Sequence, residues 1–157
     1  MQGFPVTTLR NIGGMKQFNF IPNEHVGSLP FYTGKLIESA VTPLGGKTWF
    51  TGYSTFQKLL WREEEQLSEH GNFYQQTLSG FVPWHDDELQ ELMEEMSGYR
   101  HIIDAYNNNG KRILAGTIEN GLRFSATFDS GAVPGVVKGY AFRFFTESGE
   151  RVPFYEP

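Results

Sequence analysis

The sequence predicts an α+β domain of mainly antiparallel β-structure, a sandwich or partial barrel with one amphipathic helix packed on the sheet. Two Asn-Gly pairs, Asn109-Gly110 and Asn120-Gly121, separate β-prone segments and favour the tight turns that join antiparallel strands. Leu122–Asp129 alternates apolar and polar side chains, as a strand with one buried face does. Apolar residues at helical spacing form one clear stripe, within residues 86–97.

Before the helix we expect strands separated by short loops. Gly45-Gly46 is predicted to be a hairpin turn, and residues 70–72 are predicted to form another turn. The charged run at residues 62–65 is expected to end the strand before it. The expected strands are residues 16–21, 31–41, 49–53, 55–61 and 73–82.

Residues 86–97 are predicted to form the helix. Residues 86–88 are acidic, and carboxylates in a first turn complement the helix dipole and cap free amides. Gly98 is expected to end the helix in the left-handed conformation. A helix with one apolar stripe must cover another surface, so we expect it to lie on the neighbouring sheet. The stripe consists of Leu89, Leu92, Met93 and Met96.

The C-terminal part is expected to be a run of antiparallel strands. Residues 130–137 form a loop longer than a minimal hairpin turn, and apolar loops of this length often serve binding or assembly. Phe145 falls on the polar face of its strand, which suggests a second apolar contact there. The expected strands are residues 99–107, 113–118, 122–129 and 138–146.

Size and composition indicate one β-rich domain, residues 15–157, preceded by a polar N-terminal arm, residues 1–14. No apolar run is long enough for a transmembrane helix, so no membrane association is expected. The chain has no cysteine, which excludes disulfides and thiolate metal sites.

Charge is unevenly distributed along the chain. The net charge is −5, with −9 in residues 62–97 and +4 in the remainder. Such separation suits head-to-tail self-association, although a solvated acidic helix is the simpler explanation and the one that charge patterning favours. Sequence-specific nucleic-acid binding is not expected, because the sequence has no basic stripe to contact phosphates.

No motif for catalysis, metal binding or cofactor binding occurs, and the protein is expected not to be an enzyme. The histidines are not paired at metal-ligand spacing, and there is no Gly-x-Ser-x-Gly motif. The aromatic residues leave open a carbohydrate- or protein-binding β-module, with Trp49, Trp61 and Trp84 as a stacking platform. The histidines are His25, His70, His85 and His101.

A candidate assembly surface combines the apolar loop, Phe145 and the aromatic C-terminal segment. These side chains are apolar although the sequence pattern places them in a loop, on the polar face of a strand or near the C-terminus, where side chains are usually exposed to solvent. The candidate residues are Ala132, Val133, Val136, Val137, Phe145, Phe154 and Tyr155.

Residues 59–157 contain a recurring combination of one short helix, strands and glycine-containing turns. Its parts are the helix, the hairpin through Asn108-Asn109-Gly110, and the segments around Gly121-Leu122-Arg123-Phe124 and Gly139-Tyr140-Ala141-Phe142. Gly116 and the terminal Pro153-Phe154-Tyr155 complete the pattern. In these features residues 59–157 resemble a family of small phage and prophage structural proteins of the tail and head–tail connection.

The resemblance implies a tail-tube-like fold and a non-enzymatic virion subunit of a tail tube, tail-completion or neck assembly. It implies assembly into homo-oligomeric rings, with other virion structural proteins as further partners. It also implies a virion component that is assembled in the cytoplasm of a bacterial host.

Overall fold

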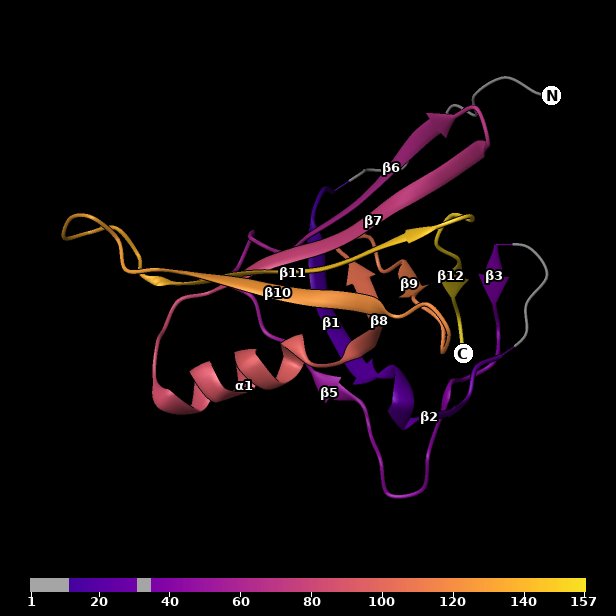
Figure 1. The fold of residues 1–157 in the computed structure, drawn as a ribbon, viewed down its shortest axis with the longest axis horizontal. Helices are drawn as coiled ribbons and strands as arrows, with labels where there is room; N and C mark the ends of the chain where they lie inside the picture. Colours follow the sequence, from indigo (N-terminus) through magenta and orange to yellow (C-terminus); the bar gives the residue numbers. More distant parts are fainter. Residues whose placement is uncertain (1–11, 31–34) are drawn as a thin grey trace.

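The computed structural model describes residues 12–30 and 35–157, and about half of these residues lie in strands, with one α-helix beside them. The predicted fold class is confirmed: the sheet curls into a partial barrel and the helix packs at its side (Figure 1). The elements are β1 (Met15–Pro22), η1 (Asn23–His25), β2 (Val26–Ser28), β3 (Leu36–Ile37), β4 (Thr42–Pro43), β5 (Phe50–Thr51), β6 (Leu60–Ser68), β7 (Gly71–Val82), α1 (Asp87–Ser97), β8 (Arg100–Asn107), β9 (Arg112–Ala115), β10 (Leu122–Asp129), β11 (Gly139–Ser148) and β12 (Phe154–Tyr155).

The main sheet has the order β3-β12-β9-β8-β10-β11-β7-β6, and β1 pairs with both β8 and β5. Among the described strands, only the short β12–β3 pair is parallel. β10 contacts β8 through two residue pairs, Leu122↔His101 and Arg123↔Arg100, and then runs alongside β11 for its whole length. The sheet therefore changes direction at this join, and a small second sheet of β2 and β4 lies apart from it.

Helix α1 lies on the side of β10 that faces the core (Figure 1). Asp86 is its N-cap, and the Asp86 carboxylate accepts a hydrogen bond of 2.8 Å from the Leu89 amide. Leu89, Met93 and Met96 are buried as predicted, whereas Leu92 remains 43% exposed. Gly98 is not left-handed as predicted: its φ is −80°, because the chain passes directly from the helix into β8.

The larger hydrophobic core lies between α1, β1 and the strands from β10 to β7. Its centre is a group of phenylalanine rings with neighbouring centroids 5.0–6.2 Å apart. Edge and tilted contacts at this spacing add to the burial of apolar area. The rings belong to Phe18, Phe124, Phe142 and Phe144.

A second core lies beyond β8 and includes Ile21, Ile102 and the ring of Tyr155. An ion pair closes it: Arg112 Nε and Nη2 each donate 2.7 Å hydrogen bonds to the carboxylate of Asp104. The Arg112 guanidinium lies between two rings, 4.7 Å from the centroids of Tyr106 and Tyr155. The hydrogen bonds from the guanidinium to Asp104 raise the pKa of Arg112.

Residues 62–65 do not end a strand, which corrects the sequence prediction. They lie inside β6, which begins at Leu60, whereas residues 55–59 are not strand. Alternation explains how a charged run pairs as a strand: Arg62 and Glu64 are exposed on one face. Glu63 on the other face accepts a 2.7 Å hydrogen bond from the amide of Val152. Of the predicted strand 31–41, residues 31–34 lie outside the described part, and only Leu36–Ile37 of the rest is strand.

The two Asn-Gly turns differ. The turn at Asn109-Gly110 joins β8 to its partner β9, as predicted. The turn at Asn120-Gly121 joins β9 to β10, which do not pair with each other because β8 lies between them. Gly46 has a φ of 79° in a turn, but this turn joins β4 to β5 in different sheets and is not a hairpin.

The predicted N-terminal arm, residues 1–14, lies largely outside the described residues. Its last residues are held: the Ile12 amide donates to Asn109 Oδ1, and Asn108 Nδ2 donates to the carbonyl of Gly13. No helix in residues 12–30 and 35–157 is long and apolar enough to span a membrane.

We expect Arg112→Gln to lower the free energy of unfolding by about 3 kcal/mol, because it leaves the buried carboxylate of Asp104 without its cation. Denaturant unfolding measures the loss. The control is Arg62→Gln, which removes an exposed pair with Glu64 and should cost no more than about 1 kcal/mol. Equal losses in the two variants would contradict this role for Arg112.

Candidate interaction surfaces

An apolar groove of about 160 Å³ opens between α1, β1 and the segment after β5. Phe18 and Phe20 from β1, together with Phe142 and Phe144 from β11, form its floor, and α1 supplies one wall. The polar atoms of its lining side chains come from Thr51, Tyr53 and Trp84. Such a groove is suited to an apolar side chain and offers few hydrogen bonds to sugar hydroxyls.

Gly52 sets the depth of this groove. Its amide donates a 2.9 Å hydrogen bond to the carbonyl of Phe18, which holds the segment after β5 against β1. A Cβ atom at Gly52 would overlap the ring of Phe18, so only glycine permits this approach.

The groove has an aromatic rim. The rings of Tyr53 and Trp84 lie 5.0 Å apart, and these residues remain 52% and 43% exposed. The three tryptophans do not form the predicted platform. Trp61 packs against the larger core and Trp49 against the second core, so Trp84 alone lines the groove.

A second surface carries three arginines. Arg100, Arg123 and Arg143 line an open depression of about 600 Å³ on the face of the sheet opposite α1. Sequence patterning indicated that Arg123 and Arg143 lie on polar faces, but only the pairing register shows that they converge. Sequence patterning did not single out Arg100, because residues 99–107 show no comparable alternation of apolar and polar side chains.

The predicted assembly residues of the β10–β11 loop are exposed. Val133, Val136 and Val137 are 61%, 54% and 62% exposed, and Ala132 is exposed beside them. The loop lies at the end of a hairpin that extends beyond the rest of the fold (Figure 1). Its side chains are therefore available to another molecule.

The other predicted assembly residues are dispersed. Phe145 is half-buried under the guanidinium of Arg143, 4.5 Å from the ring centroid. Phe154 is 47% exposed in β12, far along the sheet from the loop. Tyr155 is only 3% exposed and its hydroxyl accepts a hydrogen bond from the Val41 amide, so it belongs to the core and not to the surface.

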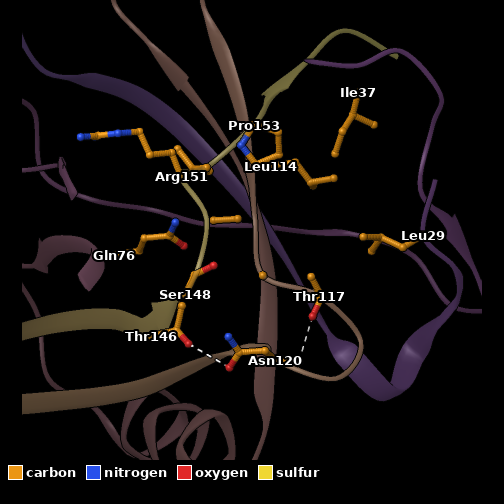
Figure 2. A pocket seen from close by; sticks show the side chains of 13 residues that line it. Leu29, Ile37, Gln76, Leu114, Thr117, Asn120, Thr146, Ser148, Arg151 and Pro153 are labelled. Atoms are coloured by element: carbon orange, nitrogen blue, oxygen red, sulfur yellow. Dashed lines mark hydrogen bonds between the residues drawn. The ribbon is translucent and has the colours of Figure 1, made fainter. Parts of the chain in front are cut away.

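A small pocket lies beneath the C-terminal segment (Figure 2). One end is polar, where Thr146 donates to Asn120 Oδ1, and the other end is apolar, with Ile37 and Leu29 (Figure 2). Its volume of about 40 Å³ admits a few water molecules but no substrate.

His101 is the most buried histidine of the described residues, at 1% exposure. Its Nε2 lies 3.0 Å from the carbonyl of Met96, and its Nδ1 has no hydrogen-bond partner among the described residues. Phenylalanine rings surround it, Phe144 at 5.3 Å and Phe20 at 5.7 Å between centroids. Burial lowers the pKa of His101, which favours the neutral imidazole.

Within residues 12–30 and 35–157 no group of three or more histidine or carboxylate side chains could hold a metal ion. The carboxylate of Glu63 makes structural contacts: it accepts hydrogen bonds from Gln76, Arg151 and the Val152 amide. This cluster fastens the C-terminal segment to the β6–β7 hairpin.

No protein-family model matches the chain, no curated protein matches its sequence, and no solved structure matches its fold. The proposed mode of assembly therefore rests on the geometry of the surfaces described above.

We expect Gly52→Ala to lower the free energy of unfolding by about 1–3 kcal/mol, because the new methyl group overlaps the ring of Phe18. Thermal or denaturant unfolding measures it. Gly45→Ala is the matched control, since a Cβ there meets nothing within 4 Å, and it should stay within about 1 kcal/mol of the wild type. The interpretation fails if the control loses as much stability as the groove variant.

We expect acidification to destabilise the fold through His101. Its folded pKa lies below the ordinary 6.5, so the unfolded chain takes up this proton first as the pH falls. The contribution of neutral His101 is complete above about pH 6.5 and declines as the pH falls toward the folded pKa. Denaturation curves between pH 7.5 and pH 5 should show a shallower decline for His101→Gln than for the exposed-site control His70→Gln. Identical slopes would contradict this assignment.

Proposed function

We propose that the protein is a non-enzymatic structural subunit that assembles with copies of itself, of the kind found in phage and prophage tails and head–tail connections. The observation that carries the proposal is the projecting β10–β11 hairpin, whose tip presents three exposed valines (Figure 1). A hairpin that leaves the body of the fold and ends in apolar side chains is suited to contact another chain.

Burial of the loop would stabilise such a contact. Complete burial of one valine side chain contributes about 1.5 kcal/mol or more. Three valines on one loop therefore supply a substantial part of an interface, whereas in the isolated chain they remain in water.

The free edge of β6 supports the same proposal. β6 pairs only with β7 among the described strands, so one row of its backbone groups is available to a strand of another chain. The exposed charges of Arg62 and Glu64 restrict which strand can pair there, because an unmatched charge disfavours the contact.

The virion assignment rests on the resemblance of residues 59–157 to small phage structural proteins. It includes assembly into rings, contact with other virion structural proteins and location in the virion. The charge separation of the sequence accords with assembly by unlike surfaces.

The apolar groove supports a second candidate function, a protein-binding β-module. Its rim of Tyr53 and Trp84 and its apolar floor are suited to an apolar side chain of a protein ligand. Few polar groups line it, which makes a carbohydrate ligand the weaker alternative. Loss of ligand binding in Trp84→Ala, with assembly unchanged, would favour this function over the first.

We expect a double substitution, Val133→Asp with Val137→Asp, to weaken self-association by about tenfold or more, because it places charges in an apolar contact. Size-exclusion chromatography with light scattering over a range of concentrations measures it. The melting temperature should not change, since both side chains are exposed.

Leu44→Asp is the control for this experiment, because Leu44 is 48% exposed on a turn outside the hairpin. It should assemble as the wild type does. A wild-type protein that remains monomeric at every concentration would contradict the proposed function.

A further inference from the structure

We propose that the three arginines of one copy bind the acidic face of α1 of the next copy, so that subunits join head to tail. The inference rests on the proposed function and specifies the two surfaces that meet. We call Arg100, Arg123 and Arg143 the arginine face, and the outward carboxylates of α1 the acidic face.

Strand register builds the arginine face. Arg123 is the Cα partner of Arg100 across the β8–β10 join. On its other side, Arg143 is the partner of Ser125, two residues further along β10, and so lies diagonally from Arg123. Side chains in these relations lie on one face of a sheet within reach of each other.

The guanidinium groups of the arginine face have no ion-pair partner within the described chain. None of its three guanidinium groups forms an ion pair with a described carboxylate, although Glu147 lines the same depression. Arg100 Nη1 donates to the Gly121 carbonyl at 3.4 Å, and Arg143 Nε donates to Ser125 Oγ at 3.2 Å. Like charges on directly opposed positions disfavour the pairing, so an external anion would stabilise this arrangement.

The acidic face carries the opposite charge, and its carboxylates also lack ion-pair partners among the described residues. Glu88, Glu91 and Glu95 follow one another at i, i+3 and i+7 along α1, and Asp87 and Glu94 flank them. All are exposed, α1 has no basic residue in its last turn, and none of these carboxylates forms an ion pair with a described residue.

The two faces point away from each other. Along β10, Phe124 faces α1 in the core, and the neighbouring Arg123 therefore faces the opposite side of the sheet. The helix of one copy does not reach its own arginine face, but it can reach that of a second copy. A contact between unlike surfaces repeats, which generates a closed ring or an open filament.

A second copy suits the arginine face better than nucleic acid does. Three arginines form a compact patch rather than a stripe along which phosphates could track. The chain as a whole is negatively charged, at −5, which disfavours approach of a polyanion. An acidic helix supplies carboxylates at a spacing of one turn, which suits clustered guanidinium groups.

Two charge-reversal variants test the proposal. The first carries Arg123→Glu with Arg143→Glu, and the second carries Glu91→Lys with Glu95→Lys. Each retains one intact face, so each alone should self-associate at least about tenfold more weakly than the wild type. Mixed in equal amounts at low ionic strength, they should form assemblies that contain the two variants one to one, because the intact arginine face of one variant forms a heterodimer with the intact acidic face of the other and the two reversed faces are complementary as well. Sedimentation velocity measures the masses, and circular dichroism verifies folding.

The matched control is Lys58→Glu with Lys111→Glu, which makes the same charge change at exposed positions outside both faces. This control variant should assemble as the wild type does. In a separate measurement, salt at about 0.5 M should dissociate the heterodimer of the two test variants, because it screens the charges. If the wild type assembles and both test variants assemble equally well, the inference is wrong and the proposed function stands.

Two further outcomes would overturn the inference. The first is a mixture of the test variants that forms no heterodimer. If the wild type is also monomeric, the proposed function is overturned together with the inference. The second combines two results. The wild type binds a fluorescein-labelled 20-base-pair DNA duplex and the Arg123→Glu with Arg143→Glu variant does not, while the mixture of the two test variants forms no heterodimer. That result would assign the arginine face to nucleic acid.

Discussion

The two-residue join between β8 and β10 is the constraint on which the rest of the fold depends. β8 pairs along its length with β1 and β9, but it contacts β10 only at His101 and Arg100. Close backbone approach makes this join possible, since a Cβ at Gly121 would lie 2.9 Å from the Cβ of Arg100. Gly116, with φ of 91°, would bring a Cβ within 2.9 Å of the His101 carbonyl. Glycine at both positions thus allows the sheet to turn.

The turn at this join separates the two sides of β10. One side receives α1 and the phenylalanine core, and the apolar groove opens beside them. The other side carries the arginine face in an open depression. Beyond the join, β10 pairs with β11, which also pairs with β7, and the valine loop between β10 and β11 projects from the body (Figure 1). The surfaces used in both proposals are therefore consequences of one local geometry.

Local sequence patterns predicted those elements that are determined by interactions between residues close together in the sequence. The stripe and the acidic first turn of α1, the alternation of Leu122–Asp129 and the turn at Asn109-Gly110 all act within a few residues. The partial barrel followed from them. Contacts between distant residues were not predictable in this way. Glu63 belongs to a strand because it binds Val152, and Tyr155 is buried because Arg112 and Val41 contact it. The arginine face depends on the pairing register between strands, and no single residue of the sequence indicates that register.

We propose that the molecule acts through its outer surfaces, by contact with further copies of itself. Electron microscopy of the purified protein at low ionic strength tests this proposal. We expect closed rings or open filaments of repeated subunits. A field of single compact particles at every concentration, with no repeated assembly, would contradict it.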